Sequence, residues 1–518
     1  MILPGNSKLT SAIPFKVLKV RLQMLVLVTS CLVALVVISV SHRVYRWRNP
    51  KCKGKLPPGS MGIPIIGETI QFFTPYKSDV FDLSPFIKKR AARYGSLFRT
   101  SVVGQLIVVS TDPDLNHYVF QNGKLFQLWY TNSSTGILGK ESIAEQQGLM
   151  HKHLRNLVLN LVGPGNLKEN LLKEMDTITR MHFDKWAPLG TFDVKEESGN
   201  VILFGPRYCY SSFNMIFNYG ALKLISYDES KSGRRLQECY TAMLDGIVSF
   251  PLNIPGTAFH KCMEGRKRAV NFIKETIDKR RMMETPQGDF LDLLLKEMEN
   301  KDAILTEEIV LDLIFLLLFL TFESTSSAIT VALKFIKENP AVLAELTNEH
   351  EAILQSRAKS DQDSGVTWKE YKSMTFTSMV INETVRLANI ATLMLRKTVQ
   401  DVEFKGYTIP AGWLVMVCPG SPHLNPVMYH NPLEFNPWRW EGQELHSASK
   451  NFIAFGGGAR HCAGADFAKL QTALFIHHLV TKYRLAIWTI VKGGEIVRKP
   501  GLVFPNGLHI KISEKNEQ

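Results

Sequence analysis

The chain has 518 residues, of which 45% are hydrophobic and 21% charged, a composition that excludes a disordered protein. Its net charge of +13 comes from one end: residues 1–55 hold ten Lys and Arg and no Asp or Glu, and the remainder carries 51 basic against 48 acidic residues. Because the excess charge is confined to this leader, we expect no nucleic-acid partner. Seven scattered cysteines without a CxxC pair suit a reducing compartment.

The N-terminal region predicts a membrane anchor. Residues 22–41 are almost unbroken apolar sequence, long enough to cross a bilayer, between a basic leader at 1–21 and a basic, Pro/Gly-rich hinge at 42–64. Six basic residues follow the apolar run closely and four precede it, which places the remaining domain, 65–518, in the cytosol. A cleaved signal peptide and an organelle transit peptide are the alternatives, and a start at Met24 would give a more usual anchor.

Beyond the hinge, the pattern predicts one large domain that is mostly α with small β-sheets (α+β). Residues Leu97–Ser110 form two β-rich runs about a Gly104–Gln105 turn, which is typical of a hairpin. From residue 163 to about residue 300, helical patterns outnumber strand patterns. No repeat or second linker interrupts the chain.

Residues Gly148–Val162 read as a helix with His151 and Arg155 four positions apart on one face. A salt bridge at a polar helix end explains such a pair most simply. The functional interpretation is donation of hydrogen bonds and positive charge to the carboxylates of a bound cofactor.

The segment Phe250–Phe259 is apolar but broken by two prolines and a glycine, so it cannot belong to a long helix. It is either a buried connector or an apolar loop that dips into the bilayer near a substrate entrance.

The stretch Ile309–Phe322 is nearly all apolar apart from Asp312 and Thr321, and it is too short for a second membrane span. We expect a helix through the core. The polar cluster Glu323–Ser327 follows, and the helical pattern resumes after it, so acid and hydroxyl groups would lie inside the helix. Such departures from pattern are expected at functional sites.

A helix at 378–389 places Glu383 and Arg386 three positions apart on one face. Further on, Arg439 is embedded among the aromatic residues of Phe435–Trp440. An arginine in such surroundings needs a partner, and Glu383 is the candidate.

The stretch Asn451–Gln471 holds three consecutive glycines, the lone Cys462 and then Gly464, and a helical pattern follows. Glycines let the backbone approach a flat cofactor and direct N–H groups at the sulfur, as a thiolate that ligates a metal centre requires. A glycine turn around one buried cysteine is the alternative. A phosphate loop fits worse, because neither GxGxxG nor a GK[ST] ending is present.

In this order, Glu383-x-x-Arg386, Phe435-x-Pro-x-Arg439-Trp440 and Phe455-x-x-Gly458-x-Arg460-x-Cys462-x-Gly464 resemble the signatures of the cytochrome P450 family of haem-thiolate monooxygenases. The resemblance runs from about residue 57 to residue 507. Motifs such as HKHLR, LTFESTS and FNPWRW look most like plant microsomal members that oxidise triterpenoids and sterols.

The resemblance implies haem b (iron protoporphyrin IX) with Cys462 as its metal ligand, and a role for each further residue. Phe455, Gly458 and Gly464 would pack around the ring near the sulfur, and Glu383, Arg386 and Arg439 would form the supporting core. The implied propionate contacts are Arg460, Arg396, Arg155 and His151, the oxygen-activating pair is Glu323 and Ser324, and the substrate pocket is Phe319, Phe322, Leu393, Met394, Val503 and Phe504.

The chain departs from the family pattern at five places. His151 stands where many members have Trp, Ser324 replaces the usual Thr, and Thr321 replaces a small residue. No Pro follows Arg386 closely, and Gln471 replaces a frequent Glu. These changes put in doubt how well oxygen use is coupled to oxidation of the substrate and which conformation the turn after Arg386 adopts.

The function implied is a single-pass endoplasmic-reticulum monooxygenase with a cytosolic catalytic domain that oxidises a large hydrophobic substrate with O2. The chain resembles no flavin or nicotinamide protein, so electrons would come from NADPH–cytochrome P450 reductase, with Lys152 and Lys469 as its contacts. The bilayer is the other expected partner. The alternatives are an oxygen-independent isomerase or dehydratase on the same fold, and a non-catalytic haem-binding membrane protein.

Overall fold

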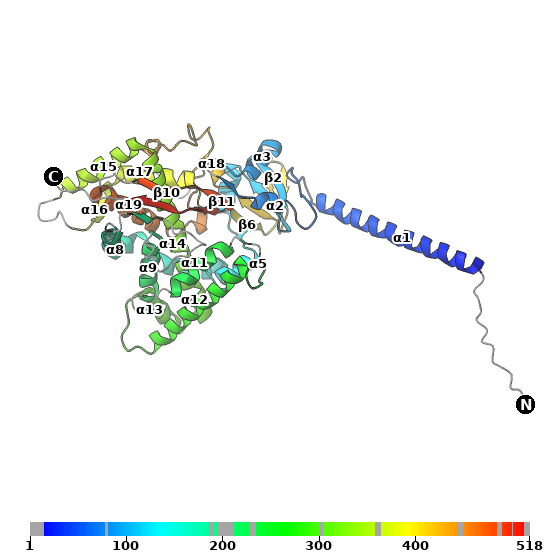
Figure 1. Ribbon diagram of the computed structural model, residues 1–518, viewed down its shortest axis with the longest axis horizontal. Coiled ribbons are helices and arrows are strands. Elements are labelled where there is room, and N and C mark those ends of the chain that lie inside the picture. Colours follow the sequence, from blue (N-terminus) through cyan, green and yellow to red (C-terminus); the bar gives the residue numbers. More distant parts are fainter. Residues whose placement is uncertain are drawn as a thin grey trace, which may run out of the picture.

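A single long helix, α1 (Phe15–Arg48), extends from one end of the computed structural model (Figure 1). It includes the expected span at 22–41 but is longer, because the basic flanks also adopt helical structure. Its most apolar stretch is exposed along its whole length, as expected of a membrane anchor. At its end, Nε1 of Trp47 donates a hydrogen bond to the carbonyl of Met61 (3.3 Å), so the helix contacts the hinge.

The structure describes residues 15–77, 81–186, 188, 191–194, 212–227, 235–247, 249, 251–300, 304–357, 364–443, 449–483, 489–499 and 501–511. Within these residues the body is mostly helical, as the sequence predicts. Its helices are α2 (Thr69–Phe73), α3 (Pro85–Tyr94), α4 (Pro113–Gln121), α5 (Asn132–Leu138), α6 (Gly148–Val162), α7 (Pro164–Asn166), α8 (Leu172–Trp186), α9 (Ser212–Ile225), α11 (Arg235–Ile247), α12 (Ala258–Arg281), α13 (Phe290–Met298), α14 (Glu307–Glu338), α15 (Pro340–Gln355), α16 (Trp368–Ser373), α17 (Thr375–Ala388), α18 (Gly420–His423) and α19 (Ala465–Lys482).

The strands of the described residues form four small sheets, with orders β2-β3-β9-β6-β4, β1-β11-β12, β10-β13-β5 and β7-β8. The expected hairpin is confirmed, but its turn lies at Val103 and Gly104, where φ is positive, one residue earlier than predicted. The strands are β1 (Tyr76–Lys77), β2 (Leu97–Val102), β3 (Gln105–Ser110), β4 (Phe126–Leu128), β5 (Thr191–Asp193), β6 (Met394–Thr398), β7 (Val402–Phe404), β8 (Tyr407–Ile409), β9 (Leu414–Val417), β10 (Thr489–Gly493), β11 (Val497–Lys499), β12 (Gly501–Val503) and β13 (Leu508–Lys511).

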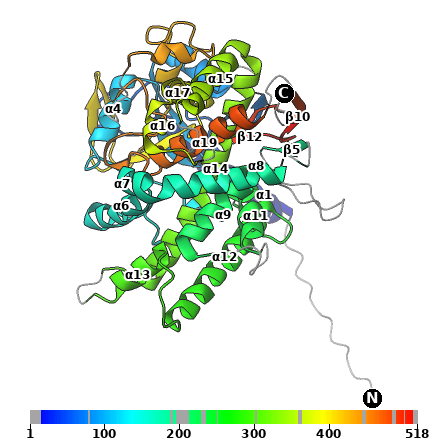
Figure 2. The ribbon, with the colours of Figure 1, turned by 90° about the vertical axis from the view of Figure 1, so that its left-hand side faces the viewer.

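Helix α14 passes through the centre of the body, with α9, α12, α17 and α19 packed against it (Figure 2). It begins at the Thr306 cap, whose hydroxyl accepts a hydrogen bond from the N–H of Ile309. The helix runs without a break through the polar cluster Glu323–Ser327, as the sequence predicts. Most of its residues are buried, so this apolar helix is a core helix.

Helices α11 and α12 form a hairpin that packs on α14. The connecting loop belongs to the segment that the sequence singles out at Phe250–Phe259, of which Phe250 lies outside the described residues. The loop is exposed, with Leu252 and Ile254 about half accessible, so the buried-connector interpretation is wrong for this part. The loop ends where the Thr257 hydroxyl caps α12.

Candidate active site

The loop that carries Cys462 is held in one conformation by its glycines. Gly456 and Gly458 have positive φ (74° and 62°), which residues with a side chain rarely adopt. A Cβ at Gly458 would lie 2.0 Å from the carbonyl oxygen of Phe120, so the main chain of α4 leaves room only for glycine. The N–H of Cys462 donates to the carbonyl of Phe455 (2.9 Å), which closes the turn.

Cys462 is exposed as a residue, but protein atoms are packed closely around its thiol. Burial is the main effect that raises the pKa of the thiol. The N–H of Gly464 and the charge of Arg155 oppose this effect by favouring the thiolate. A bound metal ion would displace the proton, since a cysteine ligand binds as the thiolate.

Three arginines from different elements gather beside this loop: Arg155 of α6, Arg396 of β6 and Arg460. Burial lowers the pKa of each guanidinium, that of Arg396 to about 10. None of them pairs with a carboxylate of the described residues; Arg396 and Arg460 donate to main-chain carbonyls, and Arg460 also to the side-chain oxygen of Gln147. Unpaired charges in such surroundings are costly, so the cluster is suited to an anionic group.

His151 lies beside the same cluster. Burial first, and then the charges of Arg460 and Arg155, lower the pKa of His151 to about 4, so its ring is neutral near pH 7. A neutral imidazole retains one N–H, which can donate a hydrogen bond to a carboxylate without adding charge. The sequence places His151 and Arg155 on one face of α6, and the structure brings both to the cysteine loop.

These observations fit the haem that the sequence implies. Cys462 lies near Arg155, and Arg155 belongs with Arg460 and Arg396 to a cluster of guanidinium groups that lack a carboxylate partner among the described residues. This arrangement matches an iron porphyrin, which takes one thiolate ligand and carries two propionates. Among all the residues that the structure describes, no group of three or more His, Cys, Asp or Glu side chains is placed to hold a metal ion. A metal here would therefore come with ligands of its own, as porphyrin iron does.

A cavity of about 520 Å³ adjoins the cluster, and Arg396 and Arg460 are among the residues that line it. Its lining is largely apolar and includes Leu393 and Met394, two of the predicted pocket residues. The sulfur of Met394 lies within 3.8 Å of the position that a Cβ at Gly456 would take, so the cavity wall and the cysteine loop touch. Trp129 and Tyr130, in the loop that follows β4, also line it, whereas the sequence interpretation missed Phe72 and Phe73 of α2 and Val103 of the β2–β3 turn.

In the middle of α14, polar and apolar side chains lie on the same face of the helix. Ser324 is exposed, and its hydroxyl donates to the carbonyl of Leu320 (2.9 Å), one turn earlier. Leu320 is 50% exposed on the same face, whereas the predicted pocket residue Phe319 is 6% exposed within the main core cluster. Glu323 is half-buried in the same turn as Ser324.

The other predicted pocket residues remain predictions. Val503 is half-buried in β12, and Phe504 is 4% exposed in the main core cluster. The side chain of Phe322 lies outside the described part of the chain. At Gly464 the φ angle is negative and nothing lies within 4 Å of an added Cβ, so the described protein atoms alone do not require glycine there.

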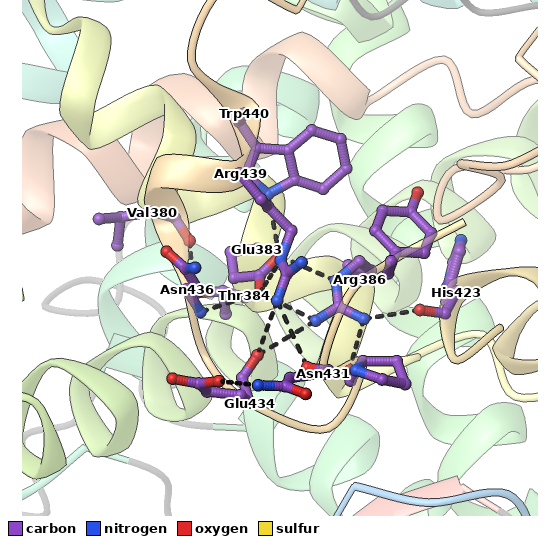
Figure 3. Close-up of polar contacts among 12 residues, drawn as sticks. Val380, Glu383, Thr384, Arg386, His423, Asn431, Glu434, Asn436, Arg439 and Trp440 are labelled. Atoms are coloured by element: carbon purple, nitrogen blue, oxygen red, sulfur yellow. Dashed lines mark hydrogen bonds and ion pairs between the residues drawn. The ribbon is translucent and has the colours of Figure 1, made fainter. Parts of the chain in front are cut away.

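The carboxylate of Glu383 is the centre of a buried polar cluster (Figure 3). Arg386 donates to both oxygens (2.8 Å each), and the Nε of Arg439 donates to one of them (2.8 Å). The N–H of Asn436 (3.0 Å) and the indole N–H of Trp440 (2.9 Å) complete five hydrogen bonds. Arg386 also donates to three main-chain carbonyls, at 2.6, 2.8 and 3.4 Å. The predicted pairing of Arg439 with Glu383 is confirmed, and Trp440 is a further donor that was not predicted.

The turn after α17 forms without the proline that many family members have after Arg386. Asn389 adopts a left-handed conformation (φ 43°) and ends the helix. Arg498 of β11 donates to the carbonyls of Ala388 (2.5 Å) and Asn389 (3.2 Å). These bonds hold the turn that leads to Leu393 and Met394. Arg498 was missed because it lies more than a hundred residues away in the sequence.

Comparisons with known proteins agree with this site. The family model described as "Cytochrome P450" matches residues 57–510. The chain is 51% identical to Cytochrome P450 87A3 of Oryza sativa subsp. japonica, over 91% of this chain and 88% of that protein. It is 41% identical to Beta-amyrin 16-alpha-hydroxylase CYP87D16 of Maesa lanceolata (94% and 98%) and 40% identical to Cucurbitadienol 11-hydroxylase of Siraitia grosvenorii (92% and 96%).

The fold is also that of a solved structure. Retinoic acid bound cyanobacterial CYP120A1 superposes with a TM-score of 0.76 at 24% identity, over 90% of this chain and all of the other. This likeness shows the fold, and the family model and the relatives show the class of enzyme. The chain therefore belongs to the cytochrome P450 family and is a cytochrome P450 monooxygenase.

Proposed function

We propose that this enzyme hydroxylates, or oxidises further, a polycyclic triterpenoid or sterol at the endoplasmic-reticulum membrane. The observation that carries the substrate class is identity of 40% and 41%, over more than nine-tenths of the chain, to two enzymes named for hydroxylating the triterpenes cucurbitadienol and β-amyrin. The largely apolar cavity of about 520 Å³ supports it, because such a volume admits a large hydrophobic molecule.

In this proposal the haem, when bound, supplies the oxygen chemistry that inserts one oxygen atom into an unactivated C–H bond. The chain supplies the surroundings. Cys462 provides the thiolate ligand, and Arg155, Arg396 and Arg460 neutralise the propionates. His151 adds a neutral hydrogen-bond donor.

Glu323 and Ser324 are proposed to move protons toward the oxygen site. They are neighbours in one turn of α14, with Ser324 exposed and Glu323 half-buried. The Ser324 hydroxyl donates to a helix carbonyl and keeps its oxygen lone pairs for a proton donor. Serine in place of threonine lacks one methyl group, so its hydroxyl rotates more freely, and we expect looser coupling of oxygen use to product formation.

Electrons are proposed to arrive from NADPH–cytochrome P450 reductase at the face that carries the cysteine loop. Lys152 is exposed on α6, one residue from His151, and is free to meet an acidic partner. Lys469 is half-buried, its ammonium lies 5.5 Å from the centre of the Phe455 ring, and burial lowers its pKa. Lys152 is therefore the better of the two predicted contacts.

The lipid bilayer is the third proposed partner. Helix α1 has the length and the exposed apolar surface of a membrane span. Exposed isoleucines lie close to its end along the chain, with Ile65 81% and Ile70 71% accessible. Phe73 and Val103 are partly exposed and also line the cavity. A membrane-bound substrate would enter the cavity from that side.

The test is incubation of the purified enzyme with reductase, NADPH and a panel of sterols and cyclic triterpenes under labelled oxygen gas, read by mass spectrometry. We expect a product from a polycyclic substrate that contains one labelled oxygen atom. Turnover without the label would indicate an isomerase or dehydratase. Turnover of fatty acids or small phenolics alone would show that the substrate class is wrong.

A further inference from the structure

Helix α2 forms part of the cavity wall but has little packing of its own. It is five residues long, and none of them is buried. Thr69 accepts one hydrogen bond from the N–H of Val103 (2.7 Å), which ties the helix to the exposed β2–β3 turn. Phe72 and Phe73 nevertheless line the cavity. Hydrophobic burial of α2 is therefore too small to fix these two rings in place.

Glu68, the residue before α2, joins this helix to two neighbouring elements. Its buried carboxylate accepts hydrogen bonds from Nε (3.0 Å) and Nη2 (2.6 Å) of Arg90 in α3. It also accepts one from the hydroxyl of Thr100 in β2 (2.6 Å). The main chain of Glu68 takes part as well, because its N–H donates to the carbonyl of Ser101 (2.7 Å) and its carbonyl accepts from the N–H of Phe72 (3.0 Å). The start of α2 is thus held by both the side chain and the main chain of one residue.

Arg90 extends the contact to a ring in the cavity wall. Its Nη2 also donates to the side-chain oxygen of Gln71 in α2 (2.7 Å). Its guanidinium carbon lies 3.6 Å from the centre of the Phe86 ring, which is buried in α3. Phe86 in turn makes an edge-on contact with Phe72, with 5.4 Å between the ring centres. The path of contacts that begins at the Glu68 carboxylate therefore ends at the cavity.

Helix α2 lies at the outer end of the cavity. Figure 1 shows it with α3 and β2 on the side of the body from which α1 extends. Phe73 and Val103 line the cavity and are partly exposed, whereas Arg396, at the haem site, is buried. A ligand that binds at the haem and fills the cavity therefore reaches α2, and a short ligand does not.

We propose that Glu68 is a positioning residue for substrate binding: its ion pair with Arg90 fixes the two phenylalanines of α2 and so sets the affinity for long hydrophobic ligands. The proposal rests on the proposed function in taking the natural ligand to be a large hydrophobic molecule. Loss of the carboxylate charge leaves the buried guanidinium of Arg90 without a counter-charge. Arg90 then turns toward water, and the rings of Phe86 and Phe72 lose their support.

The test compares ketoconazole, a long azole, with imidazole, by titration of the haem absorbance shift in the full-length holoenzyme in phospholipid nanodiscs. Both compounds bind haem iron through a ring nitrogen, but only ketoconazole is long enough to reach α2. Glu68→Gln keeps the shape of the side chain and should weaken ketoconazole binding by about tenfold, the size expected when one aromatic ring loses its contact with a ligand. Imidazole binding should stay unchanged.

A double-mutant cycle tests whether Glu68 acts through Phe72. Phe72→Ala should itself weaken ketoconazole binding, because it removes the ring from the cavity wall. Adding Glu68→Gln to Phe72→Ala should then weaken binding further by less than about twofold, since the group through which Glu68 acts is already absent. A full tenfold further loss in the double variant would overturn the assigned path.

The chain contains a second buried ion pair of the same geometry, which serves as the control. Glu370 of α16 accepts from Nε (2.6 Å) and Nη2 (3.2 Å) of Arg357 and from the hydroxyl of Thr367 (2.9 Å). The Arg357 and Glu370 side chains are 7% and 15% exposed, against 11% and 8% for Arg90 and Glu68. Neither residue of the control pair is among the described residues that line the cavity. Glu370→Gln should therefore lower stability and bind both azoles as the wild type does.

Three results would each overturn the proposal: unchanged ketoconazole affinity in Glu68→Gln, an equal loss of imidazole affinity, or an equal ketoconazole loss in Glu370→Gln. If Glu68→Gln does not fold, Thr100→Val takes its place, since it removes only one of the hydrogen bonds to the carboxylate. We expect a loss of about twofold, for ketoconazole alone, and wild-type affinity in this variant would then overturn the proposal. If the enzyme oxidises no polycyclic substrate, the proposed function fails while the azole affinities still report on Glu68.

Discussion

Replacing Glu383 with glutamine should destabilise the protein severely. The carboxylate accepts five hydrogen bonds, and both it and Arg386 are fully buried. The amide of the introduced glutamine would keep the shape but would remove the counter-charge of Arg386 and Arg439. It would also turn an NH2 group toward donors. Breaking a buried pair from one side costs about 3–5 kcal/mol, a large part of the roughly 5–15 kcal/mol by which a folded domain is usually stabilised.

The assay is urea denaturation in detergent, followed by circular dichroism and by haem absorbance, with an exposed ion pair as the control. Lys482 and Asp184 lie 2.6 Å apart with side chains 37% and 63% exposed, so Asp184→Asn should cost about 0–1 kcal/mol. We expect Glu383→Gln to unfold at much lower urea, or not to accumulate as folded protein. A midpoint equal to that of Asp184→Asn would refute the argument that this cluster supports the core.

The remaining predictions concern the cysteine loop, the propionate cluster and pH. Gly458→Ala should lower the ratio of haem absorbance to protein absorbance after purification, since its Cβ would meet the Phe120 carbonyl at 2.0 Å; a normal ratio would contradict this. Arg396→Leu should speed haem transfer to apomyoglobin by about tenfold, the value of one charge-assisted hydrogen bond; an unchanged rate would remove Arg396 from the site. Burial, with a smaller effect of the neighbouring His478 charge, lowers the pKa of His350 to about 3. The unfolded chain, with a histidine pKa of about 6.5, then binds more protons, so stability should fall as pH drops from about 6.5 toward 3. His350→Gln should reduce this slope by up to about 1.4 kcal/mol per pH unit in denaturation series; an identical slope would contradict the assignment.

The sequence predicts those parts of the site in which local chemistry forces a contact. Arg439 among aromatic side chains needs an acid, and Glu383 meets it at 2.8 Å. The helical pattern on both sides of Glu323–Ser327 requires an uninterrupted α14, and the structure has one. In these cases a residue type and its immediate neighbours are sufficient for the inference.

Contacts between segments that are far apart in the sequence cannot be predicted from a residue and its immediate neighbours. Arg498 caps the turn after α17 from a strand more than a hundred residues away, and no local pattern indicates it. Leu320 lies in an apolar run in which every position looks alike, so its exposed face becomes visible only after packing. Asp312 stands out in the sequence as a polar interruption, but its partners Arg266 and Glu141 come from segments that only the fold brings to it.

The central claim is that Cys462 is the thiolate ligand of a haem held by the arginine cluster, and the reduced carbonyl spectrum tests it most directly. The wild-type enzyme, reduced and exposed to carbon monoxide, should show the long-wavelength Soret band that a thiolate ligand produces. Cys462→Ser should lose this band, while Cys418→Ser, at a buried cysteine outside the site, should keep it. A Cys462→Ser variant that keeps the band would contradict the assignment of the ligand and of the site built around it.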